Sequence, residues 1–219
     1  MATENLTLSE FFGTQRNPYN YAKVEQVSRD LATAWLTLDE ITQQLNLFND
    51  ESQDSYLSSL ELATRMAIED YLGLAVYPTQ YKVYYGNTGL YGTAVYLDLP
   101  EVSAAQGNTA GVTINSVQYY SDANVLTTLA STYYYYDPTG NRVIVTSIPD
   151  TLSQYVANPI VVTYTQNASF IAQYPVVKQA ALLLLTHLYN NRSNTSDGRL
   201  VEIPYGVDAL LRPYKPLVM

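Results

Sequence analysis

Histidine and cysteine, two side chains common in catalysis, are scarce or absent in this chain of 219 residues. The sequence has one histidine, His187, and no cysteine, which excludes disulfides, thiolate zinc sites and thiol nucleophiles. A lone histidine in a leucine-rich helix is typical of a core or interface residue rather than a ligand. A histidine-dependent triad would require His187, and the sequence has no GxSxG motif to supply the serine.

Acidic residues occur as sequence neighbours. Glu69 and Asp70 are adjacent in a predicted helix, about 100° apart around its axis, so we expect that their carboxylates do not converge. Two further acidic pairs, at 39–40 and 50–51, lie in the first turns of predicted helices, where the helix dipole favours acids. EF-hand, HExxH, Walker and Rossmann motifs are absent from the sequence. We therefore predict no enzyme activity, no metal site and no cofactor.

The charge balance argues against another class of function. A formal net charge of -9, from 11 basic and 20 acidic residues, does not suit a protein that grips nucleic acid by neutralising phosphates. DNA could still pass nearby, because an acidic wall repels phosphate and lets a duplex slide. The first residues, MATENLTLSEFF, lack the basic and apolar regions of a secretory signal, so we expect none.

The most apolar stretch is 174–191, YPVVKQAALLLLTHLYNN, and it predicts the central helix of the fold. Pro175 suits a first helical turn, and the apolar residues that follow cover nearly every side of a helix, which predicts burial. Lys178, Gln179 and Thr186 interrupt the run, which is shorter than the roughly 20 residues of a membrane span. We expect a core helix and no membrane segment.

A short helix is predicted to precede it, from Leu36 to about Leu45. Thr37 and Glu40 have the spacing of a capping box, and Leu36 can pack against Ile41 as a hydrophobic staple. These are the clearest helix-start signals in the sequence.

A longer helix is predicted to be capped by 49–52 and to end at Leu72, with Gly73 as its C-cap. Glu61 and Arg65 are expected to pair on its outer side. Its expected core positions recur at intervals of three or four residues: Leu57, Leu60, Ala63, Ala67 and Tyr71.

Residues 1–35 are predicted to form an extension with two short helices. Thr7 and Glu10 form a possible capping box for the first. The second is indicated over 22–34, where Val24, Val27, Leu31 and Ala34 have helical spacing and Glu25 and Arg29 stand at i, i+4.

After residue 75 the apolar period changes from 3.6 to 2, which predicts strands. The strand-like segments are 81–85, 94–99, 112–120, 131–136, 142–146 and 160–165. The segment 137–140, Asp-Pro-Thr-Gly, has the residues of a hairpin turn. Because no crossover helices intervene, we predict an antiparallel module of five to seven strands.

Tyrosine is unusually common, with 22 tyrosines against 4 phenylalanines. Two explanations are open. Tyrosine suits surfaces that become buried on assembly, because it combines an apolar body with a polar tip. Strands also favour tyrosine in general.

The predicted fold class is α+β: a helical bundle core with an inserted antiparallel β module and an extended C-terminal arm. The arm is apolar but cut by Pro204, Pro213 and Pro216, so we expect no long helix there. The predicted parts are 1–35 as N-terminal extension, 36–74 with 170–198 as helical core, 75–169 as β module and 199–219 as arm.

The order of these parts resembles the head-tail connector (adaptor, or head completion) proteins of tailed bacteriophages. The resemblance covers about 36–215 and is most specific where the Pro175 helix ends in LYNNR and PxGVxxLLxPY follows. It rests on LTLDEITQQL at 36–45, SLELATRMAIEDYLG at 59–73, INSVQYYSD at 114–122, YPVVKQAALLLLTHLYNNR at 174–192 and IPYGVDALLRPYK at 203–215. The extension 1–35 and the long β module depart from the family pattern.

This resemblance implies a structural virion protein at the head-tail interface, assembled in the host cytoplasm. Twelve copies would form a ring under the portal, extend the DNA channel and dock the next connector ring or the tail. The partners would be other copies, the portal protein, the next connector or tail protein, and double-stranded DNA that passes without sequence-specific binding. Neither a cofactor nor a membrane is implied.

The resemblance also suggests functional residues. The portal-binding arm would use Ile203, Pro204, Tyr205, Val207, Leu210, Leu211, Arg212, Pro213 and Tyr214. Asp50, Glu51 and Asp54 could line the DNA channel, although a solvated helix cap explains them equally well. The alternatives in function are a tail or baseplate component, or a carbohydrate-binding β module that uses surface tyrosines.

Overall fold

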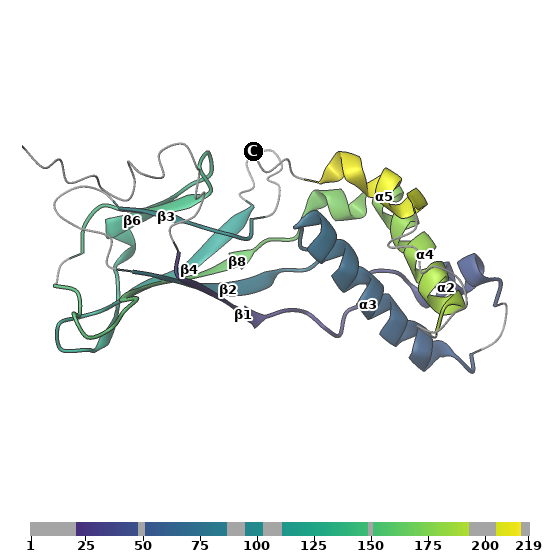
Figure 1. The fold of residues 1–219 in the computed structure, drawn as a ribbon, viewed down its shortest axis with the longest axis horizontal. Coiled ribbons are helices and arrows are strands. Elements are labelled where there is room, and N and C mark those ends of the chain that lie inside the picture. Colours follow the sequence, from purple (N-terminus) through teal and green to yellow (C-terminus); the bar gives the residue numbers. More distant parts are fainter. Residues whose placement is uncertain are drawn as a thin grey trace, which may run out of the picture. The chain divides into compact units, whose positions relative to one another are not determined.

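The computed structural model describes residues 21–47, 51–86, 95–102, 111–148, 151–192 and 205–215. The fold is α+β, with helices and strands in separate stretches of the chain (Figure 1). The chain divides into two compact units. Unit 1 comprises Met1–Glu25, Lys82–Pro100 and Ile114–Tyr164, and unit 2 comprises Gln26–Tyr81, Glu101–Thr113 and Thr165–Met219.

Eight strands occur in the described residues, arranged as two sheets, whereas five to seven strands were predicted. They are β1 (Lys23–Ser28), β2 (Thr79–Tyr85), β3 (Val95–Asp98), β4 (Val112–Tyr120), β5 (Leu126–Thr128), β6 (Tyr134–Asp137), β7 (Arg142–Val145) and β8 (Ile160–Gln166). The larger sheet has the order β1-β2-β8-β4-β5 and the smaller one β3-β7-β6. The two strands that the sequence did not predict, β1 and β5, are the edges of the larger sheet.

The helix predicted over 22–34 is wrong, because this stretch begins with strand β1. The strand lies beside β2, and the amide of Ala22 donates to the carbonyl oxygen of Tyr84 at 2.8 Å. Glu25 contacts Lys23 and accepts a hydrogen bond from the hydroxyl of Tyr84 at 2.7 Å, rather than pairing with Arg29. Valine favours strands, and pairing with β2 stabilises this segment as one.

The predicted hairpin lies in the smaller sheet, where β7 pairs antiparallel with both β3 and β6. Strand β6 starts later than predicted, because Ser131–Tyr133 form a 3-10 turn, η1. Asp137 Oδ1 accepts hydrogen bonds from the amide and the hydroxyl of Thr139, at 2.9 and 2.6 Å. In this turn Asn141 has a left-handed backbone, with φ of 51°.

The first helix of unit 2, α2 (Leu38–Leu45), begins as the sequence predicts. The Thr37 hydroxyl accepts from the amide of Glu40 at 3.2 Å, and the Glu40 carboxylate accepts from the amide of Thr37 at 2.8 Å. Leu36 and Ile41 are both buried in the same apolar core. The capping box is confirmed.

The second helix, α3 (Asp54–Leu72), ends as predicted but begins differently. Gly73 closes it with a left-handed backbone, φ 63°, which a side chain rarely adopts. At the other end the N-cap residue is Gln53, and it makes no side-chain capping bond. Of the predicted caps, 49–50 lie outside the described residues.

The face that α3 buries agrees with the prediction only in part: Leu57 is buried, and Leu60 and Tyr71 pack against the core. Ala63 and Ala67 are exposed, whereas Glu61 and Arg65, expected on the outer side, are 3 % and 1 % exposed. Ala-rich spacing suggested an apolar face, but the helix turns its charged residues inward because they have partners there.

The predicted central helix is α4 (Pro175–Asn190), with Pro175 at its first position. Only one face is fully buried, formed by Val177, Ala180, Ala181, Leu184 and Leu185. Three of its other leucines are half-buried and Val176 is exposed, so complete burial was overpredicted. None of the helices in the described ranges is long and apolar enough to span a membrane.

Helix α4 contacts α2, α3, the 3-10 turn η2 (Phe170–Gln173) and α5 (Tyr205–Leu211). These helices lie close together (Figure 1), and their side chains share one apolar core. The described part of the predicted arm is therefore helical. It consists of α5 and the 3-10 turn η3 (Arg212–Tyr214), and it packs on α4.

Candidate functional site

The buried face of α3 carries three charged side chains, each one turn from the next: Glu61, Arg65 and Glu69, which we call the charged stripe. Spacing of i, i+4 and i+8 places them on one side of the helix. They are all at most 5 % exposed, so each needs partners to offset its desolvation. Most of these partners lie in residues 29–36, the segment between β1 and α2.

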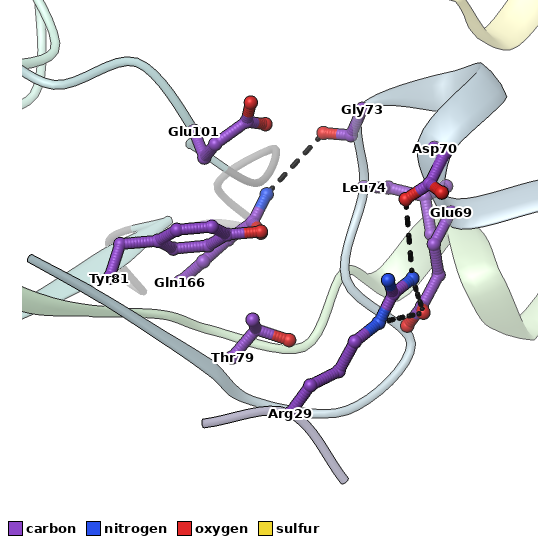
Figure 2. Close-up of a pocket in the computed structure, with 9 residues that line it drawn as sticks. All are labelled: Arg29, Glu69, Asp70, Gly73, Leu74, Thr79, Tyr81, Glu101 and Gln166. Atoms are coloured by element: carbon purple, nitrogen blue, oxygen red, sulfur yellow. Dashed lines mark hydrogen bonds and ion pairs between the residues drawn. The ribbon is translucent and has the colours of Figure 1, made fainter. Parts of the chain in front are cut away.

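At one end of the stripe, Arg29 joins two carboxylates (Figure 2). Its Nε donates to Glu69 Oε2 at 3.0 Å, and its Nη2 contacts Glu69 Oε2 and lies 3.3 Å from Asp70 Oδ1. Glu69 Oε1 also accepts from the amide of Val76 at 2.8 Å. The expectation that Glu69 and Asp70 do not converge is wrong, because one long guanidinium side chain reaches both.

A pocket of about 270 Å³ lies beside this ion pair. Tyr81, Gln166 and Glu101 line the opposite side, and Gln166 Nε2 donates to the carbonyl oxygen of Gly73 at 3.4 Å (Figure 2). Burial raises the pKa of the Glu101 carboxyl, and the charge of Asp70 raises it further. Burial also lowers the pKa of Arg29, but its contacts with Glu69 and Asp70 outweigh that effect and raise the pKa overall.

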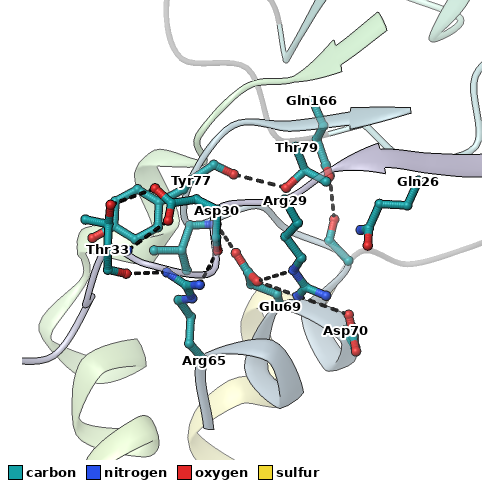
Figure 3. Close-up of polar contacts among 12 residues, drawn as sticks. Gln26, Arg29, Asp30, Thr33, Arg65, Glu69, Asp70, Tyr77, Thr79 and Gln166 are labelled. Atoms are coloured by element: carbon teal, nitrogen blue, oxygen red, sulfur yellow. Dashed lines mark hydrogen bonds and ion pairs between the residues drawn. The ribbon is translucent and has the colours of Figure 1, made fainter. Parts of the chain in front are cut away.

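In the middle of the stripe, Arg65 binds the backbone of the 29–36 segment (Figure 3). Its Nη1 donates to the carbonyl oxygen of Thr33 at 2.6 Å and its Nη2 to that of Asp30. The guanidinium lies 5.1 Å from the ring centroid of Tyr77, and the Tyr77 hydroxyl donates to the carbonyl oxygen of Ala34 at 2.8 Å. The cation thus satisfies two carbonyls and stacks on a ring.

A compact turn shapes the same segment. Asp30 Oδ1 accepts from the amides of Ala32 and Thr33, at 2.9 and 2.8 Å, and Asp30 Oδ2 accepts from the Thr33 hydroxyl at 2.7 Å. The hydrogen bond from the Thr33 amide is the main reason that the pKa of Asp30 is lowered to about 2. The turn presents the Asp30 and Thr33 carbonyls to Arg65 (Figure 3).

At the other end of the stripe, Glu61 Oε1 accepts from the amides of Trp35 and Leu36, at 2.9 and 3.2 Å. The side chains of Trp35 and Leu36 are buried in the apolar core. Buried amides without partners would be costly, so the carboxylate allows the chain to enter the core just before α2.

This arrangement fixes local structure. Each member of the stripe already holds a backbone group or an opposite charge, and the lining of the pocket includes no serine, cysteine or histidine. Within the described ranges, no group of three potential metal ligands occurs. The chemistry of the site is the fixing of one segment against one helix.

The residues predicted for the portal-binding arm are not all available at the surface. Val207 and Leu211 are each 1 % exposed and belong to the helical core. Ile203 and Pro204 lie outside the described residues, and Tyr205 begins α5.

The other predicted arm residues lie further out. Arg212 and Pro213 are exposed, and Leu210 and Tyr214 are half-buried. The Tyr214 ring lies 5.7 Å from the ring of Tyr174, edge to face. The structure thus separates the predicted arm into a buried side and an outer side.

The predicted channel acids are only partly described. Glu51 is exposed and Asp54 is half-buried at the start of α3, whereas Asp50 lies outside the described residues. His187 is half-buried, and Asn191 Nδ2 donates to its carbonyl oxygen at 2.8 Å.

Sequence reasoning missed the charged stripe. Its signal was present as charges at four-residue spacing, but pairs of this kind are usually solvated. Only the partners in 29–36 distinguish a buried set of charges from a solvated one, and sequence spacing does not reveal these partners.

Comparison with known proteins gives similarity in fold only. No family model and no curated protein sequence matches the chain. A chain in the neck of the empty GTA particle, computed with C6 symmetry, has a TM-score of 0.61 and 21 % identity. A chain in the virion of the native gene transfer agent (GTA) particle has 0.61 and 20 %, and one in the native neck, computed with C12 symmetry, has 0.55 and 19 %. Each match covers 90 % of this chain and 97 % of the other.

Proposed function

We propose that this protein is a structural component of a virion neck, a head-to-tail adaptor. The observation that carries the proposal is the similarity of fold along 90 % of this chain, and 97 % of the other, to chains from GTA neck structures. A match over nearly both whole chains supports a shared architecture rather than one shared motif. The motifs at 36–45 and 174–192 agree with it independently, because they resemble phage connector proteins.

In this proposal, twelve copies form a ring under the portal. The neck structures with similar chains were computed with C6 and C12 symmetry. Both symmetries agree with a ring of twelve copies. The ring extends the DNA channel and docks the next connector ring or tail, within the virion at the head-tail interface. Assembly takes place in the host cytoplasm, and the protein performs no catalysis.

The proposed division of the fold keeps the predicted parts. Helices α2, α3 and α4 form a bundle core over 36–74 and 170–198, with 75–169 as the inserted β module. The apolar core that these helices share supports the bundle, and it also includes Trp35, Val76, Val207 and Leu211 from the neighbouring parts. Residues 199–219 form the arm, and 1–35 the extension.

We assign portal binding to the outer side of the arm. Arg212 and Pro213 are exposed, and Leu210 and Tyr214 are within reach of a partner, whereas Val207 and Leu211 fasten α5 to its own core. Ile203, Pro204 and Tyr205 would complete the contact. Asp50, Glu51 and Asp54 remain the proposed channel lining, where negative charge would let DNA slide.

Electron microscopy of the purified chain, with and without the portal protein, tests this function. The proposal expects rings, alone or on the portal. Arg212→Glu should abolish portal docking while the thermal unfolding midpoint stays unchanged, because Arg212 is exposed. Lys178→Glu makes the same charge change on α4, outside the arm, and should still dock.

The two parts of the proposal fail separately. A chain that never forms rings, with or without portal, contradicts the adaptor function. Rings that dock equally well with Arg212→Glu contradict only the arm assignment.

A further inference from the structure

The smaller sheet presents tyrosines on its outer face. Tyr96 of β3 and Tyr135 of β6 both stand opposite Ile144 of β7, so all three share one face. Tyr96 is 49 % and Tyr135 54 % exposed, whereas Val143 and Leu97 on the other face are fully buried. Since the two tyrosines are separated by two strand spacings, their backbones lie about 10 Å apart.

A row of charges borders these tyrosines. Two residues further along the strands, on the same face, Arg142 stands between Asp98 and Asp137. The Arg142 guanidinium lies 5.5 Å from the ring centroid of Tyr96, and its Nε lies 3.9 Å from Asp98 Oδ1. Two carboxylates around one guanidinium leave this row with one net negative charge. We call the residues of both positions the tyrosine face.

A second surface in unit 1 has the opposite charge. Lys23 of β1 and Lys82 of β2 lie 5.3 and 5.4 Å from the ring centroid of Tyr84, and Glu25 accepts a hydrogen bond from the Tyr84 hydroxyl. Val83, the neighbour of these β2 residues, is fully buried, so Lys82 and Tyr84 point outward. Two lysines with one glutamate leave one net positive charge. We call these four residues the lysine patch.

We propose that the tyrosine face of one copy docks on the lysine patch of the next copy around the ring. Tyrosine and arginine are enriched in the centres of protein interfaces, and the two surfaces have complementary charge. Each copy carries a net charge of -9, so copies repel one another unless the cations of one meet the carboxylates of the other.

The two surfaces also suit a ring in their symmetry. They are different surfaces of one chain, so their contact is head-to-tail, and repeated head-to-tail contacts form a ring when the rotation from copy to copy closes. Both belong to unit 1. This inference rests on the proposed function, because it names the contact by which the proposed ring forms.

The test uses two single variants of the full-length chain, each defective in one surface. Lys82→Glu reverses a charge of the lysine patch, and Tyr135→Ala removes a ring from the tyrosine face. Either variant alone should fail to form rings, with an association constant lowered about tenfold or more. An equimolar mixture should form two-chain complexes, because the intact tyrosine face of one variant meets the intact lysine patch of the other. Analytical ultracentrifugation measures both.

Two control variants keep the result specific. Lys82→Arg retains the charge, and Tyr155→Ala removes a tyrosine that is 86 % exposed outside both surfaces. Both controls should form rings like the unaltered chain, and all four variants should unfold at similar temperatures. Where rings require the portal, the same comparison is made with portal present.

Rings formed by Lys82→Glu or Tyr135→Ala as readily as by the unaltered chain would overturn the contact but leave the proposed function standing. A mixture that stays monomeric would also overturn it. If the unaltered chain forms no rings under either condition, the proposed function and this contact fail together.

Discussion

Unit 2, the helical unit, turns three charged side chains of α3 inward, whereas the smaller sheet of unit 1, the β unit, displays two tyrosines outward. Glu61, Arg65 and Glu69 are almost completely buried, and they bind the segment 29–36. Tyr96 and Tyr135 are about half exposed on a sheet whose other face forms the core. Residue type alone would suggest the opposite, since charges usually face water and aromatic rings the core. The difference suggests that the helical unit supplies rigidity and the β unit supplies contact.

The largest effect is expected where a buried carboxylate of the charged stripe is removed. Glu61→Ala leaves the buried amides of Trp35 and Leu36 without their acceptor. We expect a loss of about 3 kcal/mol in the free energy of unfolding. Tyr135→Ala, its outward counterpart, should change stability by less than about 0.5 kcal/mol. Urea unfolding measures both, and similar losses in the two variants would contradict the proposed division of roles.

An intermediate effect is expected at the start of α2. Thr37→Ala removes the hydroxyl that accepts from the amide of Glu40, and should cost about 1 kcal/mol. Thr42→Ala, inside the same helix, is the matched control and should cost less, because alanine favours helix interiors. Equal losses in thermal unfolding would mean that the capping box contributes little.

The smallest effect concerns acid stability. The pKa of Asp30 is lowered to about 2, so its stabilising contribution is present above the ordinary value of 3.8 and is lost as the pH falls towards 2. Asp30→Asn should therefore flatten the fall in unfolding temperature across this pH window. An unchanged slope would show that the pKa of Asp30 is the same in the folded and the unfolded chain.

Local signals in the sequence predicted what local contacts decide. The capping box at Thr37, the C-cap at Gly73 and the bounds of β4 all follow from residue types within a few positions. The prediction failed where distant partners decide. Strand β1 forms because β2 lies beside it, and α3 buries its charges because 29–36 provides partners.

The functional residues were predictable to a smaller extent. The sequence located the arm, but not that Val207 and Leu211 are buried in the core of their own chain. The abundance of tyrosine suggested an interface without showing where, because register decides which tyrosines share a face. Tyr96 and Tyr135 could be paired only after β7 was placed between their strands.

The charged stripe has a mechanical consequence. Its members bind 29–36 in reverse order along α3, from Glu69 with Arg29 to Glu61 with Leu36, over about 12 Å of helix. A pull on this segment along the helix axis therefore loads all three attachments at once, as in shear, instead of opening them one after another. Such a fastening resists sustained force better than the same bonds would if they were peeled apart in sequence.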